Sequence, residues 1–162
     1  MKNLNISTIF LLFLAIVLGS CADKTIEDTN PERPKYDPSP TVVVERYLKA
    51  LQDEDFKKAY KYEYSPSSDE AGYVIEMKRI YQDNQLKINN FQILGTEIFE
   101  LSATVVVELD ISRKSKQTGQ MINVTQRSKY GLGLFDKKWK ITGSSCIENC
   151  RVEEVPEIEI TE

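Results

Sequence analysis

The region after residue 39 opens with hydrophobic residues at helical spacing. Over residues 39–53 they recur three, four and seven positions apart, which places them on one face of a helix. Ser39-Pro40 supplies the capping oxygen and the first-turn proline typical of a helix start. A second, short helix is expected to begin at Phe56 and to be broken by Ser65-Pro66, with Tyr64 as a candidate for its inward face. Residues 67–83 are expected to form a third helix that begins at a capping serine, Ser67. The expected inward faces are Val44, Tyr47, Leu48 and Leu51, then Phe56, Ala59 and Tyr60, then Tyr73, Met77, Ile80 and Tyr81.

After residue 84 the hydrophobic period changes to two, which indicates β-strands. Gly131 and Gly133 lie opposite the apolar face of one strand, so a bend or the close approach of another group is expected there. Helices followed by antiparallel strands predict an α+β fold, with three N-terminal helices packed on a curved antiparallel sheet of about four strands. The expected strands are residues 88–94, 103–112, 122–134 and 139–142.

The N-terminus has a different pattern. One basic residue, Lys2, is followed by an apolar run from Ile6 to Leu18 and by small residues up to Cys21. The run covers 13 residues, whereas a helix needs about 20 to span a bilayer. The order is typical of a targeting segment, which is not part of the fold. The alternatives are an uncleaved anchor, an ordinary secretory signal with an incidental cysteine, and a buried helix.

The sequence Leu18-Gly19-Ser20-Cys21 resembles the lipobox of bacterial lipoproteins. The resemblance implies that a diacylglyceryl group is attached to the sulfur of Cys21 and that the chain is cut before it. Two acyl chains anchor a protein stably, whereas one does not. The expected location is therefore the cell envelope, with the membrane as a partner through the N-terminal lipid. Ala22 after the cysteine implies the outer membrane if the cell is Gram-negative.

The chain is expected to divide into four parts. Residues 1–20 are the signal peptide, and residues 21–38 are a polar, proline-containing tether that cannot bury enough apolar surface to fold. Residues 39–151 form the domain. Residues 152–162 form an acidic tail, in which isoleucines alternate with glutamates. This tail is expected either to add a short edge strand or to stay mobile.

Charge and composition exclude several classes of function. The 162 residues include 21 Lys and Arg, 25 Asp and Glu and no histidine, for a net charge of −4. This balance disfavours nucleic acids and anionic lipid surfaces, which need clustered positive charge. The lack of histidine removes His-based triads, His metal sites and the commonest general base. No metal and no cofactor are expected.

Two short segments resemble small nuclear-transport-factor-2-like lipoproteins. Residues 53–60, DEDFKKAY, look like the family's acidic turn followed by Phe and Ala-Tyr, and residues 136–141, DKKWKI, look like its closing strand. The resemblance covers about residues 39–144 and implies a cone-shaped domain with a possible pocket between helices and sheet. The family includes ketosteroid isomerases and many non-catalytic envelope proteins. No stretch matches the enzymes' acid–base motif, so a non-catalytic protein is expected.

Six aromatic residues could line such a pocket. Aromatic cavities with a few hydroxyls are ordinary sites for a small apolar ligand, and an envelope protein is the other candidate partner. The alternative is core packing, in which each hydroxyl reaches the surface or a hydrogen-bond partner. A pocket with a buried carboxylate beside a tyrosine would instead favour an isomerase- or dehydratase-like enzyme, and a filled cone a structural adaptor. The six are Tyr47, Tyr60, Tyr64, Tyr81, Tyr130 and Trp139.

Cys146 and Cys150 remain as an even pair once Cys21 carries lipid. In an oxidising compartment such a pair favours a disulfide. Along an extended strand the two would lie about 13 Å apart. The bond therefore requires a turn at residues 147–149, which is expected just past the last strand. Free thiols, a metal site completed by a partner and redox activity are the alternatives.

Overall fold

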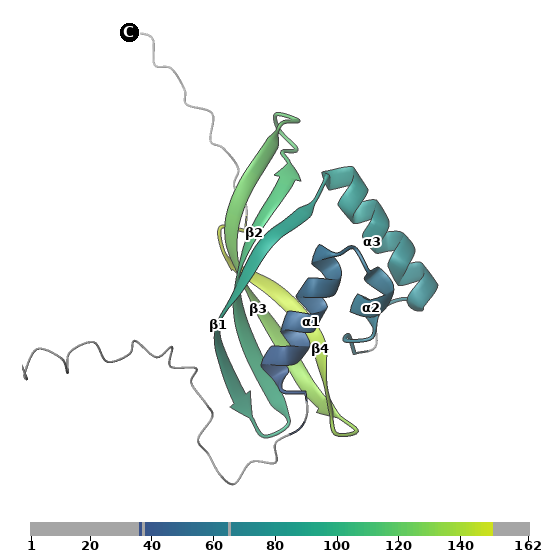
Figure 1. Cartoon of the computed structure of the whole chain (residues 1–162), viewed down its shortest axis with the longest axis vertical. Helices are drawn as coiled ribbons and strands as arrows, with labels where there is room; N and C mark the ends of the chain where they lie inside the picture. The colour runs from purple at the N-terminus through teal and green to yellow at the C-terminus, as the bar shows by residue number, and fades with distance from the viewer. Residues whose placement is uncertain (1–35, 37, 65, 151–162) are drawn as a thin grey trace, which may run out of the picture. The chain divides into compact units, whose positions relative to one another are not determined.

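Within the residues that the structure describes, three helices precede four strands (Figure 1). The computed structural model describes residue 36 and residues 38–64 and 66–150. Cys21, the signal peptide, most of the tether and the tail of residues 152–162 lie outside the described residues. The elements are α1 (Pro40–Gln52), α2 (Phe56–Tyr60), α3 (Glu70–Asn84), β1 (Lys87–Phe99), β2 (Ser102–Lys114), β3 (Met121–Phe135) and β4 (Lys138–Glu148).

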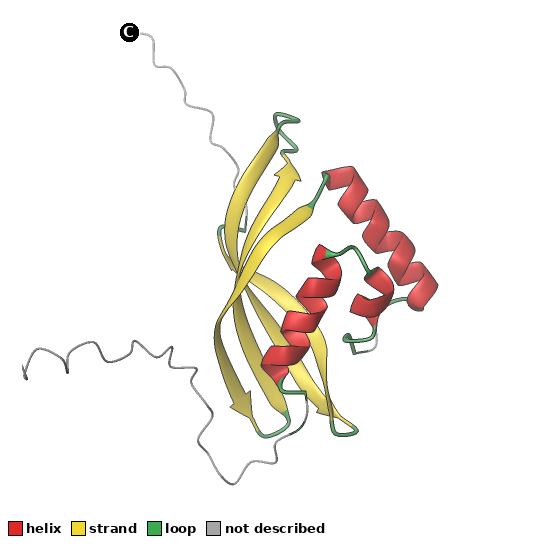
Figure 2. Cartoon of the chain, viewed as in Figure 1, coloured by secondary structure: helices red, strands yellow, loops and turns green. Residues whose placement is uncertain are grey.

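The four strands form one antiparallel sheet in the order β1-β2-β3-β4. The sheet is strongly curved, and the helices lie on one of its faces (Figure 2). The α+β class, the helix count and the strand count predicted from the sequence are therefore confirmed.

Each helix begins at a side chain that caps its first turn. Ser39, Asp55 and Asp69 accept hydrogen bonds from the backbone N–H three residues on, over 3.4, 3.1 and 2.8 Å. The third cap corrects the prediction, which gave this role to Ser67. The Asp69 carboxylate reaches the amide of Gly72, and its negative charge is stabilised by the positive end of the helix dipole.

The hydrophobic core lies between the helices and the sheet face they cover. Val44 and Leu48 of α1 are completely inaccessible to solvent. Burying one such aliphatic side chain contributes about 1.5–3 kcal/mol relative to leaving it exposed. On β2 the apolar residues of the period-two pattern face this core, and all five are buried: Ala103, Val105, Val107, Leu109 and Ile111.

All four strands are longer than predicted, and β1 and β4 extend furthest beyond their predicted ends, for different reasons. The pairing of β1 shifts register between Ile88 and Asn90 and again between Ile93 and Gly95, so side-chain alternation is interrupted and the period-two pattern disappears. Residues 142–148 of β4 are all exposed and carry little apolar character. The predicted ends at residues 94 and 142 were therefore wrong by five and six residues, respectively, since the strands end at residues 99 and 148.

The turn between β3 and β4 determines where β4 begins. Asp136 and Lys137 both have positive φ, 47° and 64°, the signature of a two-residue type I′ hairpin. One residue before the turn, the ring of Phe135 lies over Gly133, where any Cβ would collide with it. The close approach predicted at the strand glycines is thus found at Gly133.

Candidate functional site

One carboxylate is held by two tyrosine hydroxyls on the helix side of the sheet. Tyr47 of α1 and Tyr73 of α3 each donate a hydrogen bond of 2.8 Å to Oε1 of Glu63. Both tyrosines are buried and Glu63 is half-buried. Burial raises the pKa of Tyr47 and of Tyr73 well above the ordinary tyrosine value. Both hydroxyls therefore stay protonated and remain donors.

Backbone pairing with β4 places Glu63. The Tyr64 N–H donates to the carbonyl of Ile141, and the Ile141 N–H donates to the carbonyl of Tyr62, each over 2.8 Å. This makes a short parallel bridge beside β4. The Lys140 ammonium also donates to the carbonyl of Lys61. Residues 61–64 thus cover part of the open edge of β4 and project Glu63 between α1 and α3.

The six predicted aromatic residues do not share one environment. Tyr64 is 47 % exposed and stacks on Phe135, with ring centroids 3.6 Å apart. Tyr60 is half-buried and meets Tyr73 edge-to-face. None of the six lines the open pocket described below. The other four are buried members of the core: Tyr47, Tyr81, Tyr130 and Trp139.

The Glu63 cluster has the right groups for acid–base chemistry, since a carboxylate can accept a proton and a phenol can donate one. In this domain both phenols donate to the same carboxylate oxygen, and their rings are buried in the core. The hydrogen bonds therefore link α1, α3 and the edge of β4. We assign Glu63 a structural role on this basis.

Replacing Glu63 with alanine is expected to lower the free energy of unfolding by about 3 kcal/mol, because two buried hydroxyls lose their acceptor at about 1–3 kcal/mol each. Glu63→Gln keeps an acceptor oxygen, so about 1 kcal/mol is expected. Urea unfolding followed by circular dichroism measures both values. Equal stability of Glu63→Ala and wild type would contradict the structural role.

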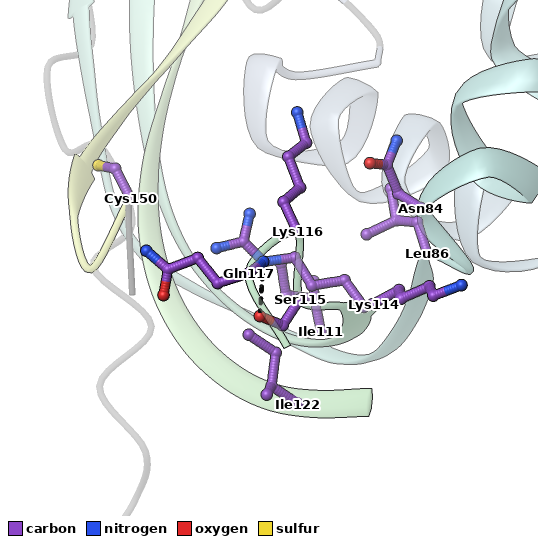
Figure 3. A pocket seen from close by; sticks show the side chains of 10 residues that line it. Asn84, Leu86, Ile111, Lys114, Ser115, Lys116, Gln117, Ile122 and Cys150 are labelled. Atoms are coloured by element: carbon purple, nitrogen blue, oxygen red, sulfur yellow. Dashed lines mark hydrogen bonds between the residues drawn. The ribbon is translucent and has the colours of Figure 1, made fainter. Parts of the chain in front are cut away.

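An open pocket lies between the end of α3 and the β2–β3 hairpin (Figure 3). Its volume is about 600 Å³, and Asn84 and Leu86 lie on one side of it with Cys150 on the other. Among the described residues that line it, none is acidic. Its apolar residues are Leu86, Ile111 and Ile122, and its cations are Arg113, Lys114 and Lys116.

The turn of the β2–β3 hairpin holds the rim of this pocket. The Ser115 N–H donates to the carbonyl of Gln120 over 2.7 Å, and the Ser115 hydroxyl accepts from the amides of Gln117 and Thr118. Gly119 has φ 71°, which a residue with a side chain adopts only at a cost. These contacts present Lys116 and Gln117 at the pocket. None of the three cations forms an ion pair with any residue that the structure describes.

Cys150 reaches the pocket as part of a disulfide with Cys146, and the two Cα atoms are 5.5 Å apart. The sequence placed the required turn beyond the last strand. In the structure Cys146 and its two successors still belong to β4, and the chain turns at Asn149, whose φ is 55°. The side-chain amide of Asn149 donates to the carbonyl of Thr125 over 3.0 Å. This contact fixes the turn against β3.

Two features of the site were not predicted. Arg113, Lys114 and Lys116 form a local basic cluster in a chain of net negative charge, and the run RKSK was the available signal. Glu63 stands between Tyr62 and Tyr64, so a carboxylate inside an aromatic run was the signal there.

The described ranges offer no group of three or more metal-ligating side chains of the His, Cys, Asp and Glu types. Within the same ranges, every helix is too short or too polar to cross a bilayer.

Comparison with known proteins identifies the fold. No protein-family model and no curated protein matches the sequence. The ketosteroid isomerase-like protein from Erwinia carotovora atroseptica SCRI1043 is similar in structure, with a TM-score of 0.51 and 12 % identity over 66 % of this chain and 92 % of that chain. The domain has a nuclear-transport-factor-2-like fold.

Two further structures have lower scores. An NTF-2 like protein of unknown function from Shewanella oneidensis MR-1 has a TM-score of 0.46 and 14 % identity over 65 % of this chain and 93 % of that chain. A protein with a cystatin-like fold from Novosphingobium aromaticivorans has a TM-score of 0.48 and 8 % identity over 68 % and 80 %, respectively. Because identities this low speak for fold alone, no activity or ligand is carried over.

Proposed function

We propose that this protein is a lipid-anchored, non-catalytic binding protein of the cell envelope. Its domain would bind an acidic segment of a partner protein in the pocket between α3 and the β2–β3 hairpin. One observation carries the proposal: three cations from the β2–β3 hairpin line an open, partly apolar pocket that has no acidic residue among its described lining.

The physical properties of the pocket favour an acidic, partly apolar occupant. A volume of about 600 Å³ is within the range of ordinary ligand sites. Three like charges held close together repel one another, and an anionic ligand relieves this repulsion. Leu86 and Ile122 are only partly buried, so short apolar side chains of the ligand would gain by covering them.

The competing function is an isomerase- or dehydratase-like enzyme, and one observation favours it. Glu63 lies 2.8 Å from the hydroxyls of Tyr47 and Tyr73, as acid–base chemistry would require. Both hydroxyls are already engaged by the same oxygen, and both rings are buried. This arrangement supports a structural role for the cluster and, with it, the non-catalytic proposal.

The proposed anchor is a diacylglyceryl group on Cys21. Residues 21–38 would form the tether, and the location would be the outer membrane if the cell is Gram-negative. Tyr36 packs against the core, four residues before α1 begins at Pro40. Residues 21–35 would then remain as the tether between the anchor and this contact.

A synthetic peptide that alternates glutamate with isoleucine is expected to bind the full-length chain in detergent. The acidic C-terminal residues 152–162 of the chain resemble this peptide and could occupy the same pocket. The tested chain therefore carries glutamine in place of their five glutamates, so that they do not compete with the peptide. Arg113→Gln with Lys116→Gln should weaken binding about fivefold, because two exposed ion pairs are lost. Fluorescence anisotropy of the labelled peptide measures the dissociation constant.

The matched control is Lys137→Gln with Lys138→Gln, which removes the same charge from the β3–β4 hairpin at the opposite end of β3. This pair should leave the affinity unchanged. Equal weakening by both pairs, or equal binding of a peptide with glutamine for glutamate, would refute the proposed site.

A further inference from the structure

We propose that the acidic C-terminal segment of the chain, residues 152–162, docks into this same pocket and competes with partner segments. The competition rests on the proposed function, whereas the docking itself does not. The structure thereby assigns the pocket an occupant from its own chain, and binding of a partner would require that occupant to leave.

The pocket and the segment are adjacent along the chain. Cys150 is part of the pocket lining, and the acidic segment begins two residues later. The disulfide to Cys146 and the hydrogen bond from Asn149 to Thr125 fix the position from which the segment starts. A ligand linked this closely acts at an effective concentration on the order of millimolar. Weak contacts are therefore sufficient to hold it.

The charges of the segment and the pocket are complementary. Residues 152–162 include five glutamates and no lysine or arginine. The three cations Arg113, Lys114 and Lys116 form no ion pair with a described residue. Opposite charges with no other partner nearby attract one another, and this attraction weakens as salt is added.

The apolar residues match as well. Ile158 and Ile160 alternate with Glu157 and Glu159, so an extended segment presents isoleucines on one side and glutamates on the other. The pocket offers apolar side chains, including Leu86, and cations on the facing hairpin. Eleven extended residues reach at most about 36 Å, which exceeds the width of a pocket of about 600 Å³.

The test measures how fast a glutamate-specific protease cuts residues 152–162 in the full-length chain in detergent, with mass spectrometry of the released peptides. Docking protects the segment in the wild type. Arg113→Gln with Lys116→Gln should speed cleavage about fivefold, because two exposed ion pairs are lost. The control pair, Lys137→Gln with Lys138→Gln, should leave the rate unchanged. High salt should speed cleavage of the wild type and of the control variant, but not of the pocket variant.

Equal cleavage rates in the wild type, the pocket variant and the control variant would overturn the docking. Protection that grows with protein concentration would also overturn it, since the segment would then occupy a second copy of the chain.

The two proposals fail separately. If the pocket substitutions weaken peptide binding but leave cleavage unchanged, docking is wrong and the proposed function stands. If they speed cleavage but leave peptide binding unchanged, the segment docks and the proposed function is wrong. If both hold, changing the five glutamates to glutamine should tighten binding of the external peptide.

Discussion

Raising the pH above 10 is expected to unfold the domain between about pH 11 and 12, because buried tyrosines must ionise. Burial raises the pKa of Tyr47, Tyr73 and Tyr81, and that of Tyr130 to about 12. A tyrosine with a raised folded pKa contributes stability that is fully present below its unfolded value of about 10 and is lost as the pH rises through the folded value. The free energy of unfolding should therefore begin to fall above about pH 10 and reach zero between about pH 11 and 12.

The size of this effect follows from proton linkage. In that window each tyrosine that is ionised when unfolded and neutral when folded lowers the free energy of unfolding by about 1.4 kcal/mol per pH unit. All four together lower it by about 5.5 kcal/mol per pH unit. The free energy of unfolding of an ordinary domain is about 5–15 kcal/mol. Few single substitutions would have so large an effect.

Circular dichroism and tyrosinate absorbance, recorded together during an alkaline titration, check this prediction. The part of the absorbance change that comes from the four buried tyrosines should coincide with the loss of the circular dichroism signal. Tyr130→Phe should reduce the dependence of stability on pH by about a quarter, since one of four ionising groups is removed. Tyr64→Phe is the control, because that ring is 47 % exposed. Full ionisation near pH 10 with the fold intact would contradict the burial of these hydroxyls.

Replacing Cys21 with serine is expected to move the protein from the membrane fraction to the soluble fraction. A serine oxygen cannot form the thioether that would carry the diacylglyceryl group. Each buried CH₂ of an acyl chain contributes about 0.8 kcal/mol, so losing two chains removes far more binding energy than any change in the domain. Fractionation of cells followed by immunoblotting measures the distribution.

The matched control replaces the other two cysteines, Cys146 and Cys150, with serine. This variant lacks the disulfide but keeps the proposed anchor, so it should stay with the membrane. If Cys21→Ser also stays there after a high-salt wash, the lipid anchor on Cys21 is wrong.

The sequence predicts most of the fold because local patterns carry it. The alternation around Val105 and Val107 marks β2, and the spacing of Val44 and Leu48 marks α1; all four are buried. The C-terminal end of β1 was predicted five residues too early because two register shifts interrupt the alternation of its side chains. The cap of α3 was misplaced because Ser67 and Asp69 both suit a helix start, and only their geometry distinguishes them.

The site was much harder to predict because long-range contacts create it. Tyr47 and Tyr73 come from different helices and meet only because residues 61–64 pair with β4. The pocket likewise joins the end of α3 to a hairpin thirty residues away and to Cys150. No local pattern in the sequence predicts contacts between residues so far apart. The sequence alone does show which residue types are available, including the cationic run that begins at Arg113.

We propose that lipid on a single sulfur holds this domain at a membrane. Mass spectrometry of the N-terminal peptide, taken from the protein extracted from membranes, tests it most directly. The predicted result is a peptide that begins at Cys21 and carries a thioether-linked diacylglyceryl group. A peptide that still begins at Met1, or one that begins elsewhere with an unmodified Cys21, would contradict the account.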